Sequence, residues 1–257
     1  MTFGVCGDIR IAAIAAATGY DFAEWTVDAV LRPREPDSVY RAALDEIGTA
    51  DLRYPVLNCF VPGDLKITGP DADGTKLREF VTTTLGRAGD AGVEVIVFGS
   101  GGARRIPDGF DRTAAHDQLV AFCAMVGPVA AEHGVTVVVE PLNRSECNVL
   151  NSVAECAALV RTVSHPAVRL LVDAYHLMRD GDSYDDIVAN ADTLAHTHIA
   201  SVPNRRAPGA EACDFGPFFD ALAKAGYDGR VSIEAKIADP EADLPVALAE
   251  MSRLTVR

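Results

Sequence analysis

The feature that most constrains the fold is a regular alternation of short apolar runs with longer amphipathic windows. The runs occupy residues 3–6, 22–26, 56–60, 93–98, 135–140, 168–173, 194–200 and 231–235. Their lengths and their content of Val, Ile and Leu are typical of buried strands, and the windows between them carry apolar residues at helical spacing. Eight such units are the number in a TIM barrel, so the sequence predicts a single (β/α)8 barrel over residues 1–257.

Glycines and one proline mark where the predicted helices end or bend. Gly92, Gly134 and Gly226 each follow a helical window and precede a strand, where a left-handed residue ends a helix at little steric cost. Pro128 lies inside the window from 118 to 133. It predicts a kink or a break there, because proline removes a backbone donor.

Composition argues against several classes of protein. The chain has 23 Lys plus Arg against 37 Asp plus Glu and a net charge of −14, so we expect no nucleic-acid partner. The six cysteines include no CxxC pair, and we expect reduced thiols in the cytoplasm. We expect the stretch IAAIAAATG to be a helix that Gly19 ends, and we expect no membrane span.

Polar residues stand where the last four predicted strands end. These residues are Glu140, Asp173, His198 and Glu234. Because the chemistry of such barrels lies at the carboxyl ends of the strands, we expect the four side chains to meet at one mouth. A carboxylate at the end of an apolar strand has to be paired, protonated or bound to a cation. Three carboxylates and one imidazole suit Mn²⁺, Mg²⁺ or Co²⁺, with Mn²⁺ as our first expectation.

Three further candidates lie in the loops after these strands. They are Glu146, His176 and Arg205. A carboxylate, an imidazole and a guanidinium suit the hydroxyls and the carbonyl of a small polyol. His196 lies two positions before His198, so it faces the same side at another depth, and we expect it to pack or to support the site.

Several motifs together resemble one family. EPLNRSE, VDAYHL, HTHIA with the following NRRAPG, and SIEAK resemble the sugar phosphate isomerase/epimerase superfamily, the xylose isomerase-like TIM barrels. The motifs are most similar to those of ketose 3-epimerases and hydroxypyruvate isomerases, and the segment VIVFGSGGARRIPDGF extends the likeness over nearly the whole chain. His198 stands where hydroxypyruvate isomerases tend to carry Gln, which favours the epimerase branch.

The resemblance implies a role for each candidate residue. The ligands of one divalent metal ion would be Glu140, Asp173, His198 and Glu234. The acid/base pair on opposite sides of a small sugar would be Glu140 and Glu234, and the substrate's oxygens would contact Glu146, His176 and Arg205. Arg206 competes with Arg205 for that role, because the loop is one residue longer than in the epimerases. A homodimer or homotetramer is also implied.

Other interpretations use the same residues. Aldose–ketose isomerisation, or dehydration or cleavage of a keto-sugar or an oxidised glycoside, would begin with the same proton abstraction as 3-epimerisation. A DNA-repair nuclease of this barrel type would carry extra histidines where this chain has LNCF and FGSGG. The Gly-rich loop GSGGARRIP, with Arg104 and Arg105, is a weak candidate for a phosphate cradle.

Overall fold

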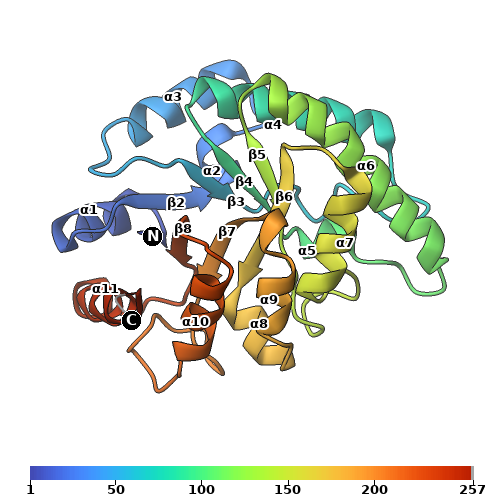
Figure 1. The fold of residues 1–257 in the computed structure, drawn as a ribbon. Helices are drawn as coiled ribbons and strands as arrows, with labels where there is room; N and C mark the ends of the chain where they lie inside the picture. Colours follow the sequence, from blue (N-terminus) through green and yellow to red (C-terminus); the bar gives the residue numbers. More distant parts are fainter. Residues whose placement is uncertain (256–257) are drawn as a thin grey trace.

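The computed structural model describes residues 1–255, in which eight parallel strands close into a barrel (Figure 1). The strands follow chain order, and β1 closes the barrel by pairing with both β2 and β8. They are β1 (Thr2–Cys6), β2 (Phe22–Thr26), β3 (Val56–Asn58), β4 (Val95–Phe98), β5 (Thr136–Val139), β6 (Val168–Asp173), β7 (Leu194–Ile199) and β8 (Arg230–Ile233). The predicted (β/α)8 barrel is confirmed.

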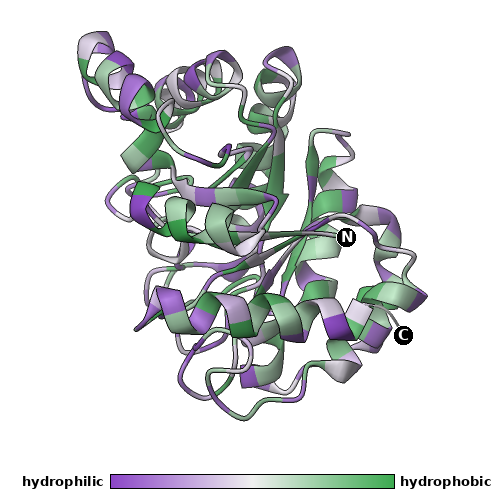
Figure 2. Cartoon of the chain, turned by 90° about the vertical axis from the view of Figure 1, so that its left-hand side faces the viewer, coloured by the Kyte–Doolittle hydropathy of each residue, from purple (hydrophilic) through white to green (hydrophobic). Residues whose placement is uncertain are grey.

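Helices surround the strands (Figure 1). They are α1 (Ile9–Thr18), α2 (Val27–Leu31), α3 (Asp37–Ile47), α4 (Gly74–Asp90), α5 (Gly101–Arg104), α6 (Arg112–Glu132), α7 (Val153–Val163), α8 (Ala174–Asp180), α9 (Asp185–Ala189), the 3-10 helix η1 (Ala191–Thr193), α10 (Gly216–Lys224) and α11 (Pro240–Thr255). The last helix packs against the first, which closes the helical layer. Figure 2 shows mostly hydrophobic strands and helices of mixed hydropathy, as expected for strands covered on both faces.

Alternation along the strands decides which side chains face the barrel interior. A small apolar cluster, separate from the larger core, is formed by Phe22, Val56, Val95, Val97, Val138 and Leu171. Because strand side chains alternate between two faces, the residue two positions further along faces the same interior. In this way Glu24 follows Phe22, Glu140 follows Val138, and Asp173 follows Leu171. The interior is therefore apolar in its lower part and polar towards the carboxyl ends of the strands.

Some predicted boundaries of the strands are too long. The run 56–60 ends as a strand at Asn58, because Cys59 has a left-handed backbone with φ of 56° that cannot continue the pairing. The run 135–140 forms a strand only over Thr136–Val139. Glu140 therefore lies just beyond the pairing, where its side chain reaches the barrel mouth.

The helix-ending glycines are confirmed, but the predicted break at Pro128 is wrong. Gly92, Gly134 and Gly226 have φ values of 71°, 69° and 67°, and Gly19 ends α1 with φ of 103°. Pro128 lies inside α6, which continues without interruption from Arg112 to Glu132. Tertiary packing of α6 on its neighbours therefore outweighs the loss of one backbone donor.

By length and composition alone, α6 would be able to cross a membrane. Its surroundings give it another role, because it packs against α4, β5 and α7 in the helical layer of the barrel. Long apolar helices of barrel proteins pass the same test of composition, so α6 is a helix of the fold.

Replacing Gly4 by Ala should destabilise the barrel interior. A Cβ at this position of β1 would come within 2.3 Å of the ring of Phe22, which is 3% exposed. We expect the free energy of unfolding to fall by about 1–3 kcal/mol, the usual cost of overpacking a core. Chemical denaturation measures it.

Gly74→Ala is the matched control, because a Cβ there would meet no heavy atom within 4 Å from the rest of residues 1–255, its chain neighbours and its own helix backbone apart. Its unfolding free energy should stay within about 0.5 kcal/mol of the wild type. Equal stability of the two variants would show that the Phe22 ring can move aside.

Candidate metal centre and active-site pocket

The structure brings the four predicted ligands together at the mouth of the barrel. Each of Glu140, Asp173, His198 and Glu234 offers one atom, and these atoms all lie within 4.8 Å of one another. Asp173 and His198 are fully buried, and Glu140 is 5% exposed. They come from four consecutive strands, as the strand-end pattern predicted.

The polar atoms of this cluster fit a divalent cation. Within residues 1–255, Oε1 of Glu140, Oδ2 of Asp173 and Nδ1 of His198 are buried and have no hydrogen-bond partner. Leaving such atoms unsatisfied is costly, and three of them at one place would be satisfied together by a metal ion. The donor set of three carboxylates and one imidazole suits Mn²⁺, Mg²⁺ or Co²⁺.

Local contacts aim these atoms at one place. The other oxygen of Asp173, Oδ1, accepts the backbone N–H of Tyr175 at 2.8 Å and thereby caps α8, which leaves Oδ2 directed to the mouth. Glu140 is held through its backbone, because Arg104 Nη2 donates to its carbonyl oxygen at 2.7 Å. The carboxylate of Asp173 is thus oriented directly, and Glu140 is held in place through its backbone.

Burial and neighbouring charges act against each other on the carboxylates. Burial raises the pKa of Asp173, since a charged carboxylate loses its hydration there. Burial also opposes ionisation of Glu234, but the His198 ring, whose Nδ1 lies 3.6 Å from Oε2, and the charge of Arg205 lower the pKa of this carboxyl. Three carboxylates so close together need positive charge, which His198 and Arg205 supply and to which a cation would add.

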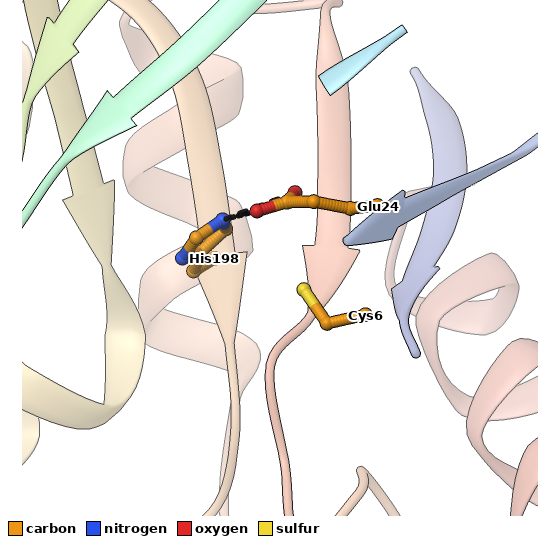
Figure 3. Close-up of side chains that lie close together, drawn as sticks. All are labelled: Cys6, Glu24 and His198. Atoms are coloured by element: carbon orange, nitrogen blue, oxygen red, sulfur yellow. Dashed lines mark hydrogen bonds and ion pairs between the residues drawn. The ribbon is translucent and has the colours of Figure 1, made fainter. Parts of the chain in front are cut away.

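Glu24 of β2 is a further residue of the site, which the sequence analysis missed. Its carboxylate is fully buried and lies 3.0 Å from Nε2 of His198 (Figure 3). It also lies 3.2 Å from Nε2 of His196. The side-chain amide of Asn58 donates to it at 3.1 Å. Because Nε2 of His198 donates to Glu24, Nδ1 is the ring nitrogen left for a metal ion, which would displace the Nδ1 proton of the charged ring.

The surroundings of Glu24 keep it ionised and keep the neighbouring thiol neutral. Burial alone would raise the pKa of Glu24, but the charge of His198 and the hydrogen bonds from both histidines lower it well below its usual range. Burial and the charge of Glu24 raise the pKa of the Cys6 thiol (Figure 3). Glu24 holds Nε2 of His198, so this group supports the first cluster from the side of β2.

One feature of the sequence does indicate Glu24 as a functional residue. It is a charged residue within an apolar run that forms a strand buried on both faces, which is the argument that singled out Glu140. The four predicted ligands stand at the ends of the last four strands, whereas Glu24 lies on the second. His196 contacts Glu24, as expected of a supporting residue.

The three predicted substrate contacts line a pocket beside the four ligands. Glu146, His176 and Arg205 share with Glu140 and Glu234 a cavity of about 450 Å³. The Nδ1 atom of His176 accepts the backbone N–H of Asn143 at 3.2 Å, so Nε2 carries the proton. The Nε2–H group of His176 is buried and has no hydrogen-bond partner among the described residues. It is available to a substrate's oxygen.

Arg205 rather than its neighbour belongs to the pocket. Its guanidinium contacts Glu234 and lies 3.7 Å from Glu146 and 3.9 Å from Asp173. Arg206 instead forms an ion pair with Asp243 at 3.2 Å and does not line the cavity. The structure therefore favours Arg205 over its competitor.

Comparison with known proteins finds relatives along nearly the whole chain. The family model described as a xylose isomerase-like TIM barrel matches residues 12–254. The ketose 3-epimerase of Arthrobacter globiformis is 34% identical over 44% of this chain and 40% of that enzyme. The L-ribulose 3-epimerase of Methylomonas sp. is 26% identical over 93% of this chain and 83% of that enzyme. A putative hydroxypyruvate isomerase of Streptomyces coelicolor is 28% identical over 88% of this chain and 85% of its own length.

Solved structures show the same barrel. D-allulose 3-epimerase from Methylomonas sp., in complex with D-allulose, superposes with a TM-score of 0.82. The match covers 98% of this chain and 96% of that one, at 22% sequence identity. Two chains that differ at most positions thus share one fold.

Replacing Glu24 by Gln should weaken metal binding although Glu24 is not among the four predicted ligands. The amide removes the negative charge that orients His198, and loss of such a supporting carboxylate typically weakens metal affinity roughly 10- to 100-fold. Isothermal titration calorimetry with Mn²⁺ measures the change.

The matched control is Glu146→Gln, which removes a pocket carboxylate outside the four ligands. Its Mn²⁺ affinity should stay within about threefold of the wild type, because a partly exposed charge is screened by solvent. An unchanged affinity in Glu24→Gln would show that β7 alone orients His198.

Proposed function

Because the chain belongs to the xylose isomerase-like TIM barrel family, we propose that it is a metal-dependent ketose 3-epimerase. The observation that carries the proposal is the approach of two carboxylates to one imidazole beside an open pocket. Glu140 Oε1 lies 3.3 Å and Glu234 Oε2 lies 3.6 Å from Nδ1 of His198. They follow β5 and β8, which are not neighbours in the barrel, so they reach the pocket from different sides.

This arrangement suits proton transfer on two faces of one carbon. A divalent ion held by the four donors would act as a Lewis acid towards a ketose carbonyl and its neighbouring hydroxyl, which makes the proton on the adjacent carbon easier to remove. Glu140 or Glu234 takes that proton as the general base. The other glutamate returns a proton on the opposite face, and the carbon is inverted.

The remaining pocket residues suit the oxygens of the resulting enediolate. His176 donates through Nε2, whose proton is fixed by the bond that Nδ1 receives from Asn143. Arg205 supplies positive charge beside Glu234. Hydrogen-bond donors that are already in place stabilise developing negative charge without a cost of reorganisation.

Aldose–ketose isomerisation is the second candidate. It is favoured by the similarity to the putative hydroxypyruvate isomerase over 88% of the chain. In that reaction one carboxylate moves the proton between adjacent carbons along one face, with the same metal and the same pocket. The position at which deuterium enters the sugar distinguishes the two reactions.

The test is proton exchange in deuterated water with Mn²⁺-loaded protein and a panel of ketoses, followed by NMR. We expect deuterium at carbon 3 together with the epimer. Glu140→Gln and Glu234→Gln should each lower the rate by about 100- to 10,000-fold, the usual contribution of a general acid or base. Circular dichroism should show folded barrels in both variants.

Glu132→Gln, at the end of α6 and outside the pocket, is the control and should exchange at the wild-type rate. Full activity in either active-site variant would remove that glutamate from proton transfer. Deuterium at carbon 1 or 2 with an aldose product would show that the reaction is isomerisation and not epimerisation.

A further inference from the structure

The charges around the pocket are predominantly negative. Among residues 1–255, the carboxylates that line it are Asp28, Glu140, Glu146 and Glu234. In the same part of the chain, Arg205 is the one arginine or lysine whose side chain lines the pocket. A divalent ion held by the four predicted ligands would offset charge within that cluster, and Asp28 and Glu146 would still repel an anion that no free side-chain cation faces.

Arg205 is not free to hold an anionic group. It contacts Glu234, lies within 4 Å of Glu146 and Asp173, and stacks on the ring of Tyr175 with 4.8 Å between the guanidinium carbon and the ring centre. One positive charge thus already faces three carboxylates. A phosphate there would compete with all three.

The arginines of the Gly-rich loop do not line the pocket, which counts against the phosphate cradle considered from the sequence. Arg104 is fully buried and donates to the carbonyl oxygens of Phe98, Glu140 and Leu150. Arg105 donates to the carbonyl oxygen of Glu146 at 2.6 Å. Neither lines the cavity.

The lysine of the neighbouring loop is also engaged with the backbone. Nζ of Lys66 donates to the carbonyl oxygens of Gly63 at 2.5 Å and Gly102 at 3.0 Å. It therefore joins the loop after β3 to α5 and is engaged with protein oxygens. Arg206 is engaged in the same way by Asp243 at 3.2 Å.

The groups that do face the pocket suit hydroxyls. Carboxylates such as Glu146 accept hydrogen bonds from them, and Nε2 of His176 donates one. We infer that the substrate is an uncharged open-chain polyhydroxy ketone, without a phosphate ester or a carboxylate. This inference rests on the proposed function, and it separates this chain from enzymes of the same barrel that act on anionic substrates.

The test compares matched pairs of free and phosphorylated ketoses. D-fructose is set against D-fructose 6-phosphate, and D-ribulose against D-ribulose 5-phosphate, with hydroxypyruvate as a small anion. We expect kcat/KM for deuterium exchange to be on the order of 100-fold higher for each free ketose, because unmatched like charges discriminate strongly. Raising the salt concentration should narrow the ratio. Equal or faster exchange of the esters or of hydroxypyruvate would overturn the inference.

Binding is measured in parallel, so that the inference and the proposed function can fail separately. Calorimetry with the same compounds and the Mn²⁺-loaded protein should show tighter binding of the free ketoses. Tighter binding of the free ketoses without any exchange would refute the epimerase proposal and leave the inference standing. Tighter binding of the esters, or binding of none of the compounds, would refute the inference.

A charge reversal at the pocket gives an independent check. Asp28→Lys replaces a lining carboxylate by a cation, and it should narrow the preference for the free ketose by about 10-fold. Asp45→Lys makes the same change on α3, outside the pocket, and should leave the ratio unchanged. An equal effect of the two reversals would show that net charge, and not the pocket, sets the preference.

Discussion

The site depends on compensation for three carboxylates that the barrel gathers in one small volume. Glu140, Asp173 and Glu234 approach His198 from neighbouring strands, and Asp173 is fully removed from water. Like charges at such distances repel, and burial alone favours protonation. His198 and Arg205 supply part of the compensating charge. The unpaired atoms of Glu140, Asp173 and His198 indicate where a divalent cation would supply the rest.

A second layer of buried polar groups holds this cluster from behind. Glu24 binds the side of His198 that faces away from the pocket, and Arg104 binds the carbonyl group of Glu140. Each interaction fixes the orientation of a ligand before any cation binds, which reduces the cost of reorganisation. The same layer keeps positive charge out of the pocket, because Arg104 directs its guanidinium to backbone oxygens. One arrangement therefore orients the donors and shapes the preference for an uncharged substrate.

Much of the fold and of the candidate site could be predicted from the amino-acid sequence alone. The alternation of apolar runs predicted the barrel, and the residues at the strand ends predicted the cluster, because parallel strands in a barrel all point their carboxyl ends to one mouth. Glu24 was missed because it lies on the second strand, far in sequence from the four predicted ligands, and only barrel closure brings it to His198. The break at Pro128 was wrong because local preference was weighed without the packing of α6.

The amino-acid sequence by itself determined the fold class and the set of donor residues, since both follow from local periodicity and from chemistry that each residue carries. Only the tertiary structure decided which atoms of those residues are free. It turned Arg104, Arg105 and Arg206 to protein oxygens, left Arg205 among three carboxylates, and placed Glu24 against two histidines. The physical reason is that the direction of a long charged side chain depends on partners distant in sequence, which come within reach only when the barrel closes.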